Sequence, residues 1–304
     1  MALKEYFFKQ GVSAIDIVIL VIVTLILIGT GITVIFLIEK EQGSSSNSSQ
    51  STIQTTKSTI PVSTSSISNS SDIAELSGGQ YSGDKYIPIL MYHYIRELPG
   101  EDDPLGQNLS VAPETFAKQL AYLKSAGYES ISFDDLREGK IPTKPVIITF
   151  DDGYEDAYQS AFPALQKEGF KGVFYIITGF VGKDLYLTWP QITEMSEGGM
   201  VFGSHTVNHP DLTSEKYTSV QIMGELEVSK ASLERHLGIT INDFCYPSGK
   251  ATTTTVDDVN EAGYKTATST QISIVQSGNY WLWLPRLRIK NDSSLSYMLN
   301  QYGL

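Results

Sequence analysis

The sequence predicts an α/β domain whose mostly parallel strands form a closed or nearly closed barrel with helices on the outside. Short apolar runs alternate with helix-like stretches from residue 86 to the C-terminus, and this alternation is typical of a parallel sheet covered by helices. The number of strand–helix units favours a barrel over an open sheet. Polar, chemically active side chains follow several of the apolar runs, which is where barrels of this class carry their active sites.

The individual elements follow from local pattern. Each expected strand is a short run rich in apolar residues, and Gly127, Gly169 and Gly263 end three of the expected helices. The expected strands cover residues 87–92, 145–150, 172–177, 200–204 and 243–246. The expected helices cover residues 112–126, 157–168, 189–197, 218–237 and 255–262.

The first 85 residues differ from the rest. Residues 17–38 are almost wholly apolar and long enough to cross a bilayer as one helix. Lys4 and Lys9 precede them, which favours a cytoplasmic N-terminus at residues 1–16. A cleaved signal peptide is the alternative, but the apolar run is long for one and no small-residue cleavage site follows it.

Residues 39–85 are expected to form a disordered extracytoplasmic linker. Their central part, residues 43–80, is rich in Ser, Thr and Asn and poor in large apolar residues, so it cannot offset the entropy cost of ordering. The folded domain is then expected at residues 86–304. The whole chain would be a single-pass protein of the cell membrane with its domain outside.

Charge and cysteine content exclude some classes of protein. The net charge is −12, and no Lys/Arg cluster is present that could follow a phosphate backbone, so nucleic acid is not an expected partner. Cys245 is the single cysteine. It permits neither a disulfide within the chain nor a cysteine-rich zinc site, and we interpret it as a buried, small apolar residue.

Two adjacent carboxylates, Asp151 and Asp152, follow the apolar strand expected at residues 145–150, and Gly153 comes next. Adjacent residues at a strand end can point in different directions. One carboxylate could therefore bind a metal while the other acts as a base. An ordinary Asp-Asp-Gly turn is the alternative interpretation.

Two of the four histidines of the chain, His205 and His209, follow another expected strand in the sequence Ser-His-Thr-Val-Asn-His. Their four-residue spacing predicts two imidazoles on one face of a helical turn. Two histidines and a carboxylate are a common ligand set for catalytic divalent metals, with positions left open for water. Two unrelated surface histidines are the alternative.

Together, the Thr-Phe-Asp-Asp-Gly and Ser-His-Thr-x-x-His motifs resemble those of polysaccharide deacetylases of the NodB-homology type, also called carbohydrate esterase family 4. The resemblance covers about residues 86–304 and implies a distorted (β/α) barrel. It implies that Asp151 is the catalytic base and that Asp152, His205 and His209 hold a divalent metal, most often zinc, with cobalt or nickel as alternatives. The ion would activate water and polarise the acetyl carbonyl.

The third motif departs from the family pattern. Residues 244–249 read Phe-Cys-Tyr-Pro-Ser-Gly, whereas relatives have Phe-Arg-x-Pro-Tyr-Gly along one wall of the substrate groove. The resemblance implies that Tyr246, Pro247 and Ser248 belong to this wall and that the Ser248 amide donates to the oxyanion. Cys245 replaces the arginine that normally orients the catalytic aspartate. Arg286 or Arg288 is the candidate substitute, and strand-flanking arginines without a role are the alternative.

The usual Leu-x-His motif near the C-terminus is also missing, because no histidine follows His236. His93 instead follows the first expected strand, as in the deacetylases of biofilm poly-N-acetylglucosamine, whose active-site histidine comes first. We therefore expect His93 to be the general acid that protonates the leaving amine. A core or capping histidine is the alternative, and His236 is expected on the surface.

The expected function is metal-dependent removal of N-acetyl groups from a cell-surface or extracellular N-acetylglucosamine polysaccharide, with poly-β-1,6-N-acetylglucosamine favoured and peptidoglycan as the alternative. Sugar rings could stack on aromatic side chains, although aromatic residues are more often part of the core. The candidates are Tyr92, Tyr154, Trp281 and Trp283. An inactive glycan-binding module on a membrane stalk and an amidase for a small exported compound are alternatives of other classes.

Overall fold

The computed structural model of this chain describes residues 76–304. The expected membrane helix at residues 17–38 and most of the expected linker lie outside these residues. Within residues 76–304, none of the helices has both the length and the apolar character needed to cross a bilayer.

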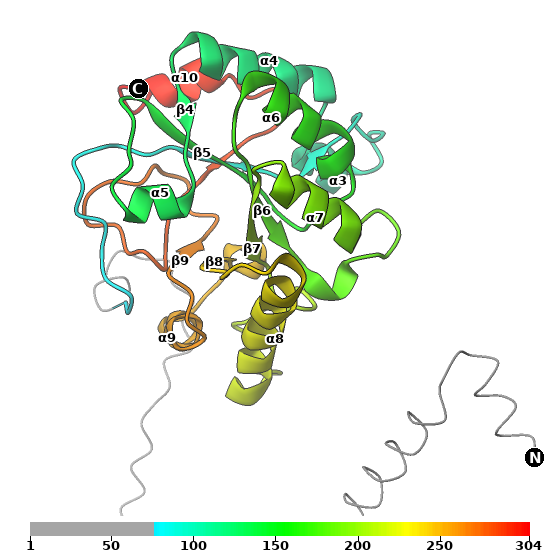
Figure 1. Cartoon of the computed structure of the whole chain (residues 1–304), viewed down its shortest axis with the longest axis vertical. Coiled ribbons are helices and arrows are strands. Elements are labelled where there is room, and N and C mark those ends of the chain that lie inside the picture. The colour runs from blue at the N-terminus through cyan, green and yellow to red at the C-terminus, as the bar shows by residue number, and fades with distance from the viewer. Residues whose placement is uncertain (1–75) are drawn as a thin grey trace, which may run out of the picture. The chain divides into compact units, whose positions relative to one another are not determined.

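A parallel sheet forms the centre of the domain (Figure 1). Within the described residues it has eight strands: seven follow one another in the order β10-β1-β5-β6-β7-β8-β9, and β4 pairs with the beginning of β5. The strands are β1 (Ile89–Tyr92), β4 (Glu129–Ser130), β5 (Pro145–Phe150), β6 (Val173–Ile176), β7 (Val201–Ser204), β8 (Asp243–Cys245), β9 (Thr266–Thr268) and β10 (Leu287–Arg288).

One short segment links the two edges of this sheet. Leu284 forms a parallel bridge with Thr268, the last residue of β9. Three residues later, Leu287 of β10 pairs with Leu90 of β1, at the opposite edge. The sheet therefore curves back toward itself into an incomplete barrel, in agreement with the expected nearly closed barrel.

The central strands β1, β5 and β6 are almost wholly apolar because both faces of the sheet are covered. In β5, Ile148 packs in the larger cluster with residues of the surrounding helices, whereas its neighbour Ile147 joins the inner cluster with Tyr175 and Cys245. The longer helices surround the strands (Figure 1). They are α4 (Pro113–Ser125), α6 (Phe162–Glu168), α7 (Trp189–Glu197), α8 (Ser219–Leu237) and α9 (Thr253–Glu261).

Short elements were not expected from the sequence, because runs of two to six residues are too short for periodicity to identify. They are β2 (Tyr94–Ile95), α3 (Pro104–Leu109), β3 (Ser110–Val111), β4, α5 (Phe133–Arg137), β9, β10 and α10 (Leu295–Asn300). The helix expected at residues 157–168 also begins differently, as a π-helix at Ala157–Ala161 that continues into α6.

The folded domain begins before residue 86. Tyr81, which the sequence placed in the linker, is almost fully buried. Its amide donates to the Asn279 carbonyl at 2.8 Å. Its ring packs edge-on against Trp281, with 5.6 Å between the ring centroids. Leu76 is buried as well. These two apolar side chains anchor a stretch whose average composition is polar, and composition alone does not reveal such single anchors.

A small two-stranded sheet beside the main one carries the segment after His93. Residues 94–95 of β2 pair with residues 110–111 of β3. Asp156, which follows the end of β5, accepts a hydrogen bond from the Ile95 amide at 3.2 Å. This contact fastens β2 to the β5–α6 connection. Burial raises the pKa of the Asp156 carboxyl to about 6.

We expect Asp156 to make the domain less stable as pH rises from about 4 to 6. Its pKa in the folded state lies above the unfolded value of about 4, so the folded protein binds the extra proton. The associated stability is fully present below the unfolded pKa and is lost as pH rises through the folded pKa. Asp156→Asn keeps an oxygen acceptor for Ile95 but cannot ionise.

Thermal unfolding of both proteins from about pH 4 to about pH 7.5 measures this effect. The Tm of Asp156→Asn, relative to that of the unsubstituted protein, should increase across this range. A Tm difference that is the same at both ends of the range would contradict the assignment.

Candidate active site and metal centre

The side chains selected from the motifs converge at one end of the barrel. His93 follows β1, Asp151 and Asp152 follow β5, and His205 follows β7. Because these strands are parallel, their carboxyl ends lie at the same rim. The cleft there is lined by His93, Leu105, Leu109, Asp151, Asp152, Tyr154, His205, His209, Tyr246, Ser248, Gly249, Thr270 and Arg288.

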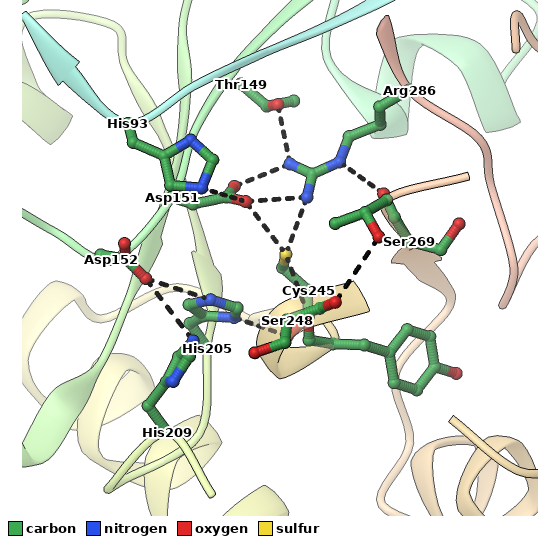
Figure 2. Close-up of polar contacts among 12 residues, drawn as sticks. His93, Thr149, Asp151, Asp152, His205, His209, Cys245, Ser248, Ser269 and Arg286 are labelled. Atoms are coloured by element: carbon green, nitrogen blue, oxygen red, sulfur yellow. Dashed lines mark hydrogen bonds and ion pairs between the residues drawn. The ribbon is translucent and has the colours of Figure 1, made fainter. Parts of the chain in front are cut away.

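Asp152, His205 and His209 lie close enough to share one metal ion (Figure 2). Asp152 Oδ1 is 3.4 Å from His205 Nε2 and 3.7 Å from His209 Nε2. Ligand atoms around a tetrahedral ion with bonds of 2.0–2.1 Å stand about 3.3 Å apart. The observed spacing therefore fits a divalent metal held by one carboxylate and two imidazoles, with coordination positions left for water and substrate.

The two histidines do not lie on a helical turn, so that expectation was wrong. Thr206 and His209 have φ values of 68° and 56°, and residues 205–209 form an irregular loop. Glu225 of α8 holds this loop by accepting hydrogen bonds from the amides of Val207 and Asn208 at 2.9 and 2.8 Å. Tertiary contacts with α8, rather than helical periodicity, bring the two imidazoles together.

Backbone strain accompanies the metal residues. Asp152 also has a positive φ, of 74°, a region that non-glycine residues adopt at a cost of about 1–3 kcal/mol each. Such residues gather where surrounding structure holds a side chain in a required direction. Here the turn directs Asp152 toward the histidines, while its neighbour Asp151 points toward Arg286 (Figure 2).

A second contact orients His205. Its Nδ1 lies 2.7 Å from the Cys245 carbonyl oxygen. A carbonyl only accepts hydrogen bonds, so Nδ1 carries a hydrogen, and Nε2 is the nitrogen that faces Asp152 and could bind a metal. Metal-binding histidines commonly donate their other nitrogen to such a partner, which fixes both the tautomer and the ring orientation.

Asp151 forms a buried, two-point ion pair with Arg286. The distances are 2.7 Å from Oδ1 to Nη1 and 2.8 Å from Oδ2 to Nη2. Arg286 is completely buried and also donates to Thr149 Oγ1 at 3.0 Å and to the Ser269 carbonyl at 2.9 Å. Of the two arginines left open by the sequence, Arg286 is therefore the one that contacts the aspartate.

This ion pair determines the protonation of Asp151. Burial by itself would raise the pKa of the carboxyl, but the Arg286 guanidinium outweighs burial and holds that pKa far below its usual range. Asp151 is therefore ionised at neutral pH.

His93 lies beside this carboxylate, with Nε2 3.8 Å from Asp151 Oδ2. Burial lowers the pKa of His93, although the charges of Asp151 and Asp152 oppose that shift. Before substrate binds, the imidazole is therefore neutral at neutral pH.

Several aromatic side chains expected to stack on sugars do not reach the cleft. Tyr92 is fully buried and donates to Gln119 Oε1 at 3.0 Å, and Trp283 is buried against Tyr246. Trp281 packs on Tyr81 and is not among the lining residues. These three expectations were wrong, because Tyr92 and Trp283 are part of the core and Trp281 packs against the inner cluster. Tyr154 does line the cleft. Its ring stacks on that of Tyr94, with 3.7 Å between the ring centroids.

The wall formed by the third motif is partly as expected. Tyr246 and Ser248 line the cleft, whereas Pro247 is buried and does not. Ser248 has a φ of 56°, so the chain turns sharply at this point. His236 is exposed on α8, as expected, and stacks on Trp189.

Sequence reasoning missed Thr149 and Ser269, which hold Arg286 in place, and Leu105 and Leu109, which line the cleft from α3. Thr149 carried a signal, because it is the polar residue in an otherwise apolar strand immediately before the Phe-Asp-Asp motif. Ser269 and the two leucines carried none, since their roles depend on contacts distant in sequence.

We expect His209→Ala to lower the affinity for zinc by about 100-fold or more, because it removes one of three protein ligands. His93→Ala is the matched control, since it removes another cleft imidazole that lies near Asp151 rather than in the ligand group. Equilibrium dialysis of the purified full-length proteins against zinc measures both. Equal zinc affinity in the His209 variant and the unsubstituted protein would contradict the ligand assignment.

Similarity to known proteins identifies the family. The sequence profile of the polysaccharide deacetylases matches residues 138–267. The structure of the Streptococcus pyogenes deacetylase PplD in complex with acetate is 35% identical, with a TM-score of 0.66, over 72% of this chain and 98% of that one. YxkH of Bacillus subtilis (strain 168), a suspected polysaccharide deacetylase, is 30% identical over 213 residues, which are 68% of this chain and 73% of YxkH.

A poly-β-1,6-N-acetyl-D-glucosamine N-deacetylase of Staphylococcus aureus (strain MRSA252) is 26% identical over 203 residues, which are 62% of this chain and 70% of that enzyme. The residues matched by the family profile include both motifs, from the two aspartates after β5 to the two histidines after β7. The chain belongs to the polysaccharide deacetylases of carbohydrate esterase family 4, which are metal-dependent hydrolases of carbon–nitrogen bonds other than peptide bonds.

Proposed function

We propose that this protein removes acetyl groups from N-acetylglucosamine residues of a cell-surface or extracellular polysaccharide and releases acetate. One observation carries the proposal: an ionised, buried Asp151 lies beside a group of metal-binding side chains, and both line the same cleft. Asp152, His205 and His209 would hold the metal. Their mixed nitrogen and oxygen donors suit zinc, with cobalt and nickel as alternatives.

When bound, the metal would lower the pKa of a water molecule and polarise the acetyl carbonyl. Asp151 would accept a proton from that water, because its carboxylate is ionised and borders the cleft. Arg286 donates to both carboxylate oxygens, which restrains the orientation of the side chain toward the reacting atoms. A base held in this way loses little orientational freedom during the reaction.

His93 would then protonate the nitrogen that leaves. Because the resting imidazole is neutral, it must first take up a proton. The protonated Asp151 is the nearest source, since the two side chains are 3.8 Å apart. Transfer from Asp151 to His93 and on to the amine would restore the ionised carboxylate for the next turnover and leave acetate and a free amino sugar.

Poly-β-1,6-N-acetylglucosamine is the polymer that we favour as substrate. The support is the position of His93 after the first strand and the similarity to the S. aureus enzyme that acts on this polymer. Peptidoglycan is the second candidate, and Arg288 supports it. This guanidinium lines the cleft and forms no hydrogen bond or ion pair with the described residues. It is therefore available for an acidic group of a peptide-bearing glycan.

We also propose that a single helix at residues 17–38 anchors the protein in the cell membrane with the catalytic domain outside. The length of the apolar run and the two lysines before it support this orientation. The polar stretch that follows would give the domain reach toward a polymer fixed at the cell surface.

Acetate release by the purified full-length protein in mild detergent tests the proposed function. We expect release from poly-β-1,6-N-acetylglucosamine, loss of release after chelation, and recovery on addition of zinc or cobalt. Peptidoglycan is assayed in parallel. Release from peptidoglycan alone would replace the favoured polymer with the second candidate. A metal-loaded protein that releases no acetate from either polymer would contradict the proposal.

The role of His93 has its own test. We expect His93→Ala to lower kcat for acetate release by about 100-fold and to retain bound zinc. His236→Ala is the matched control, because this exposed histidine on α8 does not line the cleft, and it should keep both properties. Turnover by the His93 variant at the rate of the unsubstituted protein would exclude the general-acid role.

A further inference from the structure

Cys245 contacts both the candidate metal ligand His205 and the Asp151–Arg286 ion pair (Figure 2). Its carbonyl oxygen accepts from His205 Nδ1 at 2.7 Å, and its Sγ atom lies 3.2 Å from Arg286 Nη2 and 3.6 Å from Asp151 Oδ2. We infer that Cys245 is a positioning residue, whose small side chain and thiol together hold the Asp151–Arg286 pair in its working geometry. The catalytic part of this inference rests on the proposed function.

The thiol makes two different hydrogen bonds within the pair. Its sulfur accepts from Arg286 Nη2, while its S–H donates to Asp151 Oδ2. The other acceptor near the sulfur is the Tyr246 carbonyl, at the longer distance of 3.8 Å. Asp151, Arg286 and Cys245 thus form a closed triangle of contacts. The thiol is a weak donor, and both Cys245 and Arg286 are completely buried.

Side-chain size gives the second part of the inference. Cys245 ends β8, at the position where relatives carry the arginine that orients the aspartate. Here the guanidinium arrives instead from Arg286, in the segment that joins the two edges of the sheet. Both residues are fully buried, and protein interiors are close-packed. A small residue at 245 therefore leaves the volume that the long residue at 286 fills.

The competing explanation is that Cys245 only fills the core. The two explanations differ in what a substitution changes. A core-filling residue affects stability and leaves turnover alone. A positioning residue affects kcat through Asp151, whereas metal binding is kept, because the backbone carbonyl that orients His205 is present in every variant.

The first test compares three variants of the full-length protein in the acetate-release assay. We expect Cys245→Ala to lower kcat about fivefold, the value of a weak hydrogen bond to a charged group, with KM and zinc content unchanged. Cys245→Ser restores a donor and should recover most of the lost rate. Val275→Ala is the matched control, since Val275 is a buried member of the same inner cluster that does not touch the site.

The second test exchanges the two residues. Arg286→Cys alone should abolish most activity. The double variant Cys245→Arg/Arg286→Cys keeps composition, charge and total buried volume, and it returns the guanidinium to β8. We expect its kcat to exceed that of Arg286→Cys by about tenfold or more, because volume-conserving changes are the ones a packed interior tolerates.

A crystal structure of Cys245→Ala supplies a readout that does not depend on turnover. The Asp151 carboxylate should rotate away from its two-point contact with Arg286. An unmoved carboxylate would overturn the inference. So would an unchanged kcat, an equal loss of kcat in Val275→Ala, or a folded exchange variant no faster than Arg286→Cys. Failure of the proposed function is distinct, because it appears as an unsubstituted protein that releases no acetate.

Discussion

The ion pair between Asp151 and Arg286 is the interaction on which the rest of the site depends. Buried charges are costly unless they are paired and their remaining hydrogen bonds are satisfied. Here Thr149, Ser269 and the Cys245 sulfur accept the other guanidinium hydrogens. Removing one partner of such a pair costs about 3–5 kcal/mol, since the other charge stays buried alone. Because Arg286 lies between the β9 bridge and β10, the same contact connects closure of the barrel with orientation of the base.

A second constraint comes from the parallel sheet. All its strands end at one rim, so residues far apart in sequence meet there without any long connection. The sheet does not by itself aim the side chains. Residues with a left-handed backbone conformation, such as Asp152, direct the side chains. Hydrogen bonds from neighbouring elements do so as well, such as those that Glu225 accepts from the histidine loop. The strain is local, and the surrounding packed core, with α8 against β7, sustains it.

Two adjacent carboxylates consequently acquire different chemistry. Asp151 faces a permanent cation and stays ionised, which suits a base held in one orientation. Asp152 faces two imidazoles and presents an oxygen at a spacing suited to a metal. The two residues are adjacent in sequence, and Asp152 has a left-handed backbone conformation. Cys245 connects these two environments, with its carbonyl on the metal-ligand side and its thiol on the base side.

The sequence by itself determined the strong local features. Strand β5 and helix α7 have the bounds that their apolar pattern predicts. The two motifs placed the aspartates and the histidines after strands, and parallel strands end at the same rim. Tertiary structure alone decided the rest. Arg286 and Arg288 are two residues apart, and the alternation of a strand puts both on one side, so no pattern distinguishes them. The contacts of the closing segment bury Arg286 against Asp151 and leave Arg288 in the cleft. The loop of His209 and the burial of Tyr92 were equally undetermined, since packing partners distant in sequence set both.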